Sequence, residues 1–288
     1  MANQNFRIVC LVLICLGIYL FVSAPPPLED KQAVGTSIPV VRMFEILKTE
    51  NDAVRSLWTK EIVGMGKQSG LKFDEHWRDE GIDAGPLPAL FLRETAKSLE
   101  RNPSPLSLFL GSDYPINEAN RFEGLQLDKF QSIKQTQQPQ FFYMPDIQMQ
   151  VAMFSDLAIS EGCVQCHNAH GQSPKKDWKL NDVMGATTWM YPASTVSMDE
   201  VLQTVMALHL AFREAYESYI EKARKFTNPP IIGDQWPSQG YYLPTPDQFM
   251  QEIIKRTAPH TLERLTSLSA GTQPASTSNL SENSNLAH

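Results

Sequence analysis

Apolar residues between Ser37 and Lys67 recur at steps of three and four, as on one face of an α-helix. Glycines at 64, 66 and 70 follow, and such a cluster disfavours continued helix. The pattern therefore predicts one long amphipathic helix. Its apolar positions are Val40, Met43, Ile46, Leu47, Val54, Leu57 and Ile62.

Further helices are predicted along the chain. The segment PLPALFLRETAKSLERNP begins with prolines suited to a first turn and ends at Asn102-Pro103. An apolar stripe of helical spacing runs from Val201 to Lys225, and a shorter helix is expected from Gln248 to Arg264. We also expect a helix within residues 117–130, NEANRFEGLQLDKF.

Three short aromatic or β-branched runs predict strands: Leu106 to Leu110, Pro139 to Pro145 and Gly185 to Pro192. Each is bounded by residues typical of turns. Helices crossing one face of a small antiparallel sheet give an α+β fold.

The run from Ile8 to Ala24 carries no charged residue and ends at three prolines. As a helix it would be about 25 Å long, the lower limit for a membrane span. An uncleaved anchor is favoured over a cleaved signal peptide, because cleavage after Ala24 would have to precede Pro25. Either way the chain beyond residue 25 is expected in the bacterial periplasm, anchored in the inner membrane by residues 8–24 or soluble after cleavage.

The formal net charge of −7 and the lack of a long basic run argue against a nucleic-acid partner. Residues 265–288 are rich in Ser, Thr and Asn and nearly uncharged, which predicts a disordered tail. No kinase, cyclase or phosphate-loop motif is present.

The sequence CVQCH places Cys163, Cys166 and His167 in the order C-x-x-C-H. A zinc ion would need both cysteines and both nearby histidines, including His170, yet adjacent residues rarely reach one tetrahedral ion together. A thioredoxin-like dithiol would sit at the start of a long helix in a βαβ unit, whereas Gly171 and Pro174 follow here.

A c-type haem explains more of this motif. Cys163 and Cys166 can form thioethers to the two vinyl groups of one haem, and His167 can then bind the iron as proximal ligand. The haem-maturation machinery that makes such bonds works outside the bacterial cytoplasm, in agreement with the exported chain. We expect one covalently bound haem c.

Three stretches, PLPALFLRETAKSL, RFEGLQLDKF and CVQCHNAHGQSPKKDWKLNDVMGA, resemble a known family over about residues 35–195. It is the single-haem c-type PAS-like domain that serves as the extracytoplasmic sensor of bacterial adenylate cyclases, histidine kinases and chemotaxis receptors. The resemblance implies a PAS-like antiparallel sheet with flanking helices.

The resemblance and the composition of the flanking segments together predict a domain organisation. A linker at residues 25–35 leads to the haem domain at 36–195. A helical extension at 196–264 then contains a proline- and aromatic-rich connector, and no output domain is recognised.

The sequence leaves several candidates for the sixth iron ligand. Met149, Met153 and His209 are candidates, and for each of them core packing is the alternative. His170, Lys175 and Lys176 follow the motif and could contact the haem propionates; a solvated loop is the alternative.

We expect a sensor of redox state or of a small ligand, passing its signal to an unidentified partner protein. The alternative is a single-haem electron-transfer cytochrome. A peroxidase-like enzyme is disfavoured, since no distal His/Arg pair is identifiable.

Overall fold

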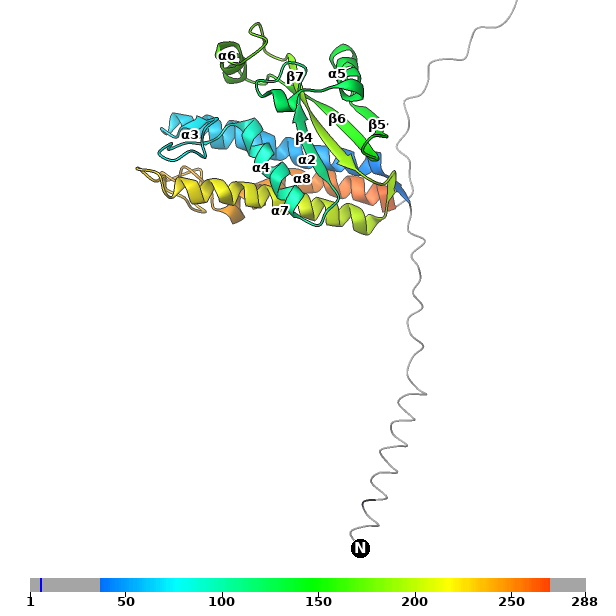
Figure 1. The fold of residues 1–288 in the computed structure, drawn as a ribbon. Helices are drawn as coiled ribbons and strands as arrows, with labels where there is room; N and C mark the ends of the chain where they lie inside the picture. Colours follow the sequence, from blue (N-terminus) through cyan, green and yellow to red (C-terminus); the bar gives the residue numbers. More distant parts are fainter. Residues whose placement is uncertain (1–5, 7–36, 270–288) are drawn as a thin grey trace, which may run out of the picture. The chain divides into compact units, whose positions relative to one another are not determined.

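A layer of helices packs against one face of a four-stranded antiparallel sheet in the computed structural model, which describes residues 37–269 together with Phe6 (Figure 1). The helical layer contains α2 (Val40–Ser56), α4 (Pro88–Arg101), α7 (Met198–Ala223) and α8 (Pro246–Ser269). Helix α2 continues through the π-helical η1 (Leu57–Gly64) into α3 (Met65–Gln68). The long first helix predicted from the sequence is thus confirmed, with a π-helical segment inside it.

Local sequence explains where these helices begin. Pro88 opens α4, where its missing N–H costs no helical hydrogen bond. Ser197 caps α7 by accepting a hydrogen bond from the Glu200 amide, and the Glu200 carboxylate accepts one from the Ser197 amide. The predicted helices at 88–101 and 201–225 are confirmed within a few residues.

The four-stranded sheet has the order β4-β7-β6-β5, antiparallel throughout. Its strands are β4 (Ser107–Gly111), β5 (Gln140–Met144), β6 (Met149–Leu157) and β7 (Val183–Tyr191). Two small pairs lie outside it: β1 (Ile38–Pro39) with β8 (Thr195–Val196), and β2 (Phe73–Asp74) with β3 (Gly85–Pro86). The three predicted strands are confirmed, and β6 is an additional central strand.

The sheet is covered on both faces. Ala152, Phe154 and Trp189 point into the large core shared with the helical layer. Met153 and Ala186 point the other way, into a small core with Phe130 of α5 (Gly124–Thr136). The expectation that helices cover one face was therefore wrong, because α5 has its own apolar side to bury. The predicted helix at 117–130 is replaced by a short 3-10 turn, η2 (Glu118–Asn120), and α5.

Helices α7 and α8 share one core with α2 and α4, including Leu47, Phe91, Phe212 and Ile253. Residues 37–269 belong to one compact unit, which contains both the predicted haem domain and the predicted helical extension. Helix α8 begins two residues before the predicted start and extends to Ser269, beyond the predicted Arg264. The connector between α7 and α8 has no helix or strand, as expected.

The predicted anchor at 8–24, the linker at 25–35 and most of the tail lie outside the described residues. Among the residues that are described, no helix is both long and apolar enough to cross a membrane.

Candidate functional site

The C-x-x-C-H motif lies on a short helix, α6 (Glu161–Ala169), between β6 and β7. The Ser160 side chain caps this helix by accepting a hydrogen bond from the Cys163 amide, and Ser160 Oγ lies 3.2 Å from Cys163 Sγ. Because β6 and β7 are antiparallel, α6 does not belong to a βαβ unit. This arrangement disagrees with the thioredoxin-like alternative.

The two thiols differ in exposure: Cys163 is half-buried and Cys166 is exposed. Partial burial raises the pKa of the Cys166 thiol, and the nearby Glu75 carboxylate raises it further, although Lys67 acts in the opposite direction. A redox-active dithiol instead requires a lowered thiol pKa. The Cys166 thiol therefore lacks the lowered pKa of a reactive cysteine.

His167 is oriented with its Nδ1 buried and without a hydrogen-bond partner. Burial lowers the pKa of its imidazole, and the neighbouring His170 lowers it further. A neutral imidazole is the form that binds a metal ion. Within residues 37–269, however, no three His, Cys, Asp or Glu side chains gather as a metal site, so the zinc alternative lacks a ligand set there.

The loop after α6 is fixed by Asn168 and Trp178. The Asn168 side chain donates to the Trp178 carbonyl at 3.0 Å and accepts from the Trp178 amide at 2.9 Å. Trp178 is buried, its Nε1 has no hydrogen-bond partner, and the Lys175 ammonium lies 4.8 Å from its ring centroid. Two buried ring nitrogens without hydrogen-bond partners, His167 Nδ1 and Trp178 Nε1, thus occur close to the motif in sequence.

Residues of the first long helix and of the following loop approach the motif from the helical layer. Arg55 of α2 is close enough to Cys163 to interact electrostatically, as Lys67 of α3 is to Cys166. His170 Nε2 lies 3.1 Å from a carboxylate oxygen of Glu75. The motif helix therefore faces the segment from Arg55 to Glu75, which includes η1.

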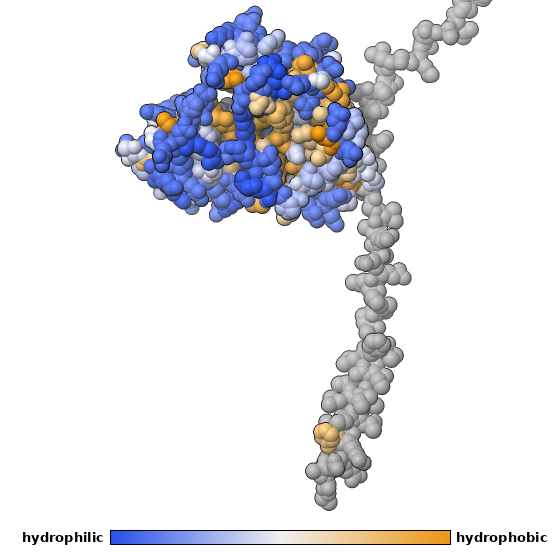
Figure 2. All heavy atoms as spheres, in the orientation of Figure 1, coloured by the Kyte–Doolittle hydropathy of each residue, from blue (hydrophilic) through white to orange (hydrophobic). Residues whose placement is uncertain are grey.

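The space-filling view shows a hollow between the segment around α6 and the helical layer, with apolar atoms on its inner wall (Figure 2). Sequence reasoning missed Arg55, which interacts with Cys163, and Glu75, which contacts His170, because they look like ordinary charges on a helix face and in a loop.

The predicted distal ligands occupy different surroundings. Met153 is fully buried in the small core under α5, where it contacts Phe122, Phe130 and Ile133. Met149 is at the end of β6 remote from α6, eight residues or about 26 Å of strand before Leu157. Met153 is therefore placed as a core residue and Met149 lies far from the motif, and the ligand assignment remains a prediction.

His209 is joined to Glu50 of α2, with 2.8 Å between Nε2 and the carboxylate. The Thr261 hydroxyl donates to the other oxygen of the same carboxylate at 2.6 Å. This contact engages the ring nitrogen that iron would need. The structure thus gives His209 a partner within the helical layer.

The predicted propionate contacts lie in the loop after α6. His170 pairs with Glu75, and Lys175 forms an ion pair with Asp177. Lys176 is exposed. All three lie on the same loop as Trp178, and their role toward a haem stays a prediction.

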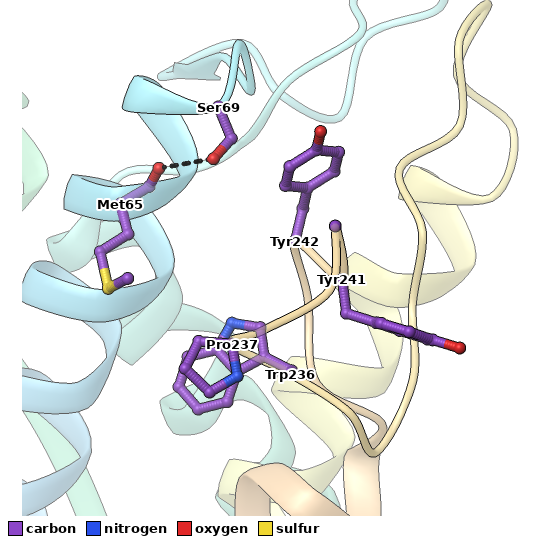
Figure 3. Close-up of a pocket in the computed structure, with 7 residues that line it drawn as sticks. Met65, Ser69, Trp236, Pro237, Tyr241 and Tyr242 are labelled. Atoms are coloured by element: carbon purple, nitrogen blue, oxygen red, sulfur yellow. Dashed lines mark hydrogen bonds between the residues drawn. The ribbon is translucent and has the colours of Figure 1, made fainter.

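One small pocket lies between α3 and the connector before α8 (Figure 3). Its volume of about 90 Å³ is well below the roughly 300 Å³ at which ligand sites begin. None of the predicted site residues lines it. The lining residues are Met65, Ser69, Trp236, Pro237, Gly240, Tyr241 and Tyr242.

Comparison with protein families gave one match. The model of the Tll0287-like family matches residues 39–192, slightly more than half of the 288-residue chain, and the matched range includes α6. The chain therefore belongs to the Tll0287-like family. Neither the comparison with curated proteins nor that with solved structures gave a match.

Proposed function

We propose that this member of the Tll0287-like family is an exported protein that holds one haem c and acts as a sensor of redox state or of a small ligand. Cys163 and Cys166 would carry the thioethers, and His167 would be the proximal iron ligand. When bound, the haem would supply a one-electron couple and an iron centre for a further ligand.

The observation that carries this proposal is that His167 on α6 is partly buried and has a ring nitrogen, Nδ1, without a hydrogen-bond partner. Burial lowers the pKa of its imidazole and so favours the neutral form. Both thiols stand within one turn of it on the same helix. A haem attached here would use the two thiols and the histidine together, whereas the dithiol alternative leaves His167 without a role and the zinc alternative lacks a gathered ligand set within residues 37–269.

The surrounding residues are suited to hold α6 in place. Ser160 caps its start, and the paired Asn168 and Trp178 fix the loop at its end. The apolar wall of the hollow beside α6 would shield one side of a bound haem from water (Figure 2). Exclusion of water and fixed ligand orientation are the means by which a protein adjusts a haem potential.

The sensing role rests on a likeness of fold. The order β4-β7-β6-β5, with α5 and α6 in the connections, agrees with a PAS-like sheet. PAS-like domains occur in many sensors, but a fold alone does not determine function. The partner would be a signalling or redox protein in the periplasm, reached from the inner membrane if residues 8–24 form an anchor.

Electron transfer is the second candidate, and the exposure of Cys166 favours it. A haem edge bonded at an exposed residue lies near the surface, where a redox partner can approach. Reduced protein that binds CO would support ligand sensing, whereas a six-coordinate iron that resists CO would support electron transfer or redox sensing.

The test is to produce the full chain together with the haem-maturation machinery and to record its pyridine-haemochrome spectrum after denaturation. A c-type spectrum is expected in the native chain. Cys163→Ala or Cys166→Ala should leave a single thioether and little holoprotein, and His167→Ala should change the iron spectrum. Cys15→Ala, in the N-terminal apolar run, is the matched control and should change nothing. If the native chain carries no covalent haem, the proposal fails.

A further inference from the structure

Helix α7 exposes a row of large apolar side chains on the side away from the core. Leu202, Met206 and Leu210 are 41%, 70% and 45% exposed, and they follow one another at four-residue steps. Residues four apart lie on the same helix face, so the three form one stripe. Contiguous exposed apolar surface of this kind marks an interaction site in a folded protein.

The stripe has a symmetric sequence about Met206. Leu202 and Leu210 lie four residues before and after it, and Asp199 and Arg213 lie seven residues before and after it. A two-fold axis through Met206 would place the α7 helices of two copies antiparallel. Each Leu202 would then face the other copy's Leu210, and each Asp199 would face the other copy's Arg213.

The charges at the two ends of the stripe are complementary in that arrangement. Asp199 is exposed, and the Arg213 side chain is 35% exposed. Within its own chain Arg213 uses Nε toward Glu217 and Nη2 toward Asp247. Its Nη1 would meet the incoming Asp199 carboxylate.

The same charges argue against a lipid surface as the occupant. Helices that lie on membranes combine an apolar face with flanking Lys and Arg residues. Here Asp199, Glu200 and Glu217 flank the stripe, and an anionic membrane would repel them.

We infer that the stripe Leu202, Met206 and Leu210 is a homodimer interface, in which α7 packs antiparallel against α7 of a second copy. The inference does not depend on haem attachment. It gives the domain a defined partner surface on the side of the helical layer formed by α7.

Cross-linking of the full chain in membranes tests whether the Met206 positions of two copies lie close together. Met206→Cys lies on the proposed axis, so a short bismaleimide should convert it into a covalent dimer. Leu125→Cys, at an exposed leucine of α5, is the matched control and should remain monomeric, as should the unsubstituted chain. Equal cross-linking of Met206→Cys and Leu125→Cys would reflect random collision and would overturn the inference.

Cross-linking between two different cysteine variants tests whether the two α7 helices are antiparallel. Two copies with different tags, one with Leu202→Cys and one with Leu210→Cys, should cross-link to each other. Leu202→Cys alone should link poorly, since two such residues would be about 12 Å apart along the antiparallel helices. The opposite pattern would contradict an antiparallel arrangement.

Sedimentation of the purified full chain in mild detergent tests the energetics. The native protein should have twice the chain mass of 32.4 kDa, and Met206→Glu should shift it to one chain mass with an unchanged Tm. Asp199→Arg should weaken the dimer, and Asp199→Arg with Arg213→Asp should restore it. A native protein that sediments as a monomer would overturn the inference. If lipid vesicles then protected Met206→Cys from thiol reagents, the stripe would bind a lipid surface instead of a second copy.

Discussion

Asn168 and Trp178 exchange two hydrogen bonds, 3.0 Å from Asn168 Nδ2 to the Trp178 carbonyl and 2.9 Å from the Trp178 amide to Asn168 Oδ1. Asn168 is the residue after His167, and Trp178 is buried at the end of the loop that follows. One side chain therefore satisfies both backbone groups of Trp178. The orientation of the motif helix is thereby coupled to the position of this loop.

We predict that Asn168→Ala loosens this loop. The change removes two hydrogen bonds and leaves backbone groups of Trp178 without partners, which should cost about 2 kcal/mol. Limited proteolysis is a direct measurement, because trypsin would cut after Lys175, Lys176 or Lys179 sooner than in the native protein. Gln172→Ala, in the same loop and exposed, should leave the cleavage rate unchanged. Equal rates for Asn168→Ala and the native protein would contradict the prediction.

Arg55, Asp156 and Thr187 join α2 to the two central strands. Arg55 Nη1 pairs with Asp156 and donates to Thr187 Oγ1 at 3.0 Å, and the Thr187 hydroxyl donates to Asp156 at 2.9 Å. Burial alone would lower the pKa of Arg55, but the Asp156 carboxylate outweighs it and raises the pKa. The arginine is thus held charged within electrostatic reach of Cys163.

We predict that Arg55→Met destabilises the protein by about 3 kcal/mol, since it leaves the Asp156 carboxylate partly buried and unpaired. Urea unfolding followed by circular dichroism would measure the loss. Lys48→Ala is the control: it breaks the exposed Lys48–Asp52 pair on the same helix and should cost less than about 1 kcal/mol. Similar losses for the two variants would show that Arg55 has no special role.

Local patterns in the sequence were sufficient for the helices of the helical layer. In α2 and α7 one side is apolar and the other polar, because each helix faces the core on one side only. The strands β4, β5 and β7 were found because turn residues bound them. The C-x-x-C-H motif identified the candidate site without any three-dimensional information.

Strand β6 was missed for a physical reason. Val151, Ala152, Met153 and Phe154 are all buried, since one face of the strand meets the helical layer and the other meets α5. A strand covered on both faces does not alternate between apolar and polar residues. The partners of Arg55 and His209 lie 101 and 159 residues away, and no local pattern gives such pairs.

Gly185 of β7 lies against the backbone of Gly111 in β4. A Cβ at this position would be 2.5 Å from the Gly111 carbonyl oxygen, a backbone atom that cannot move aside without distorting the sheet. We predict that Gly185→Ala lowers the stability by about 2 kcal/mol or more, measured as a fall in Tm. Gly171→Ala is the control, because a Cβ there meets nothing within 4 Å. A Gly185→Ala protein with native Tm would contradict the geometry.

Glu50 provides a pH-dependent contribution to stability. Its side chain is 1% exposed, and it accepts hydrogen bonds from the Thr261 hydroxyl and from His209 Nε2. Burial alone would raise the pKa of Glu50, but these hydrogen bonds outweigh it and lower the pKa below the usual 4.5. The folded protein therefore favours the carboxylate more strongly than the unfolded chain does.

The stabilisation by ionised Glu50 is complete above about pH 4.5, the unfolded pKa, and is lost as the pH falls through the lower folded pKa. Glu50→Gln should therefore cost about 2 kcal/mol near neutral pH, as expected for hydrogen bonds to a charged group. The difference in Tm from the native protein should shrink as the pH is lowered below 4.5. Glu221→Gln, exposed on α7, should show no such dependence. A Tm difference for Glu50→Gln that stays constant with pH would mean that ionisation of Glu50 does not stabilise the fold.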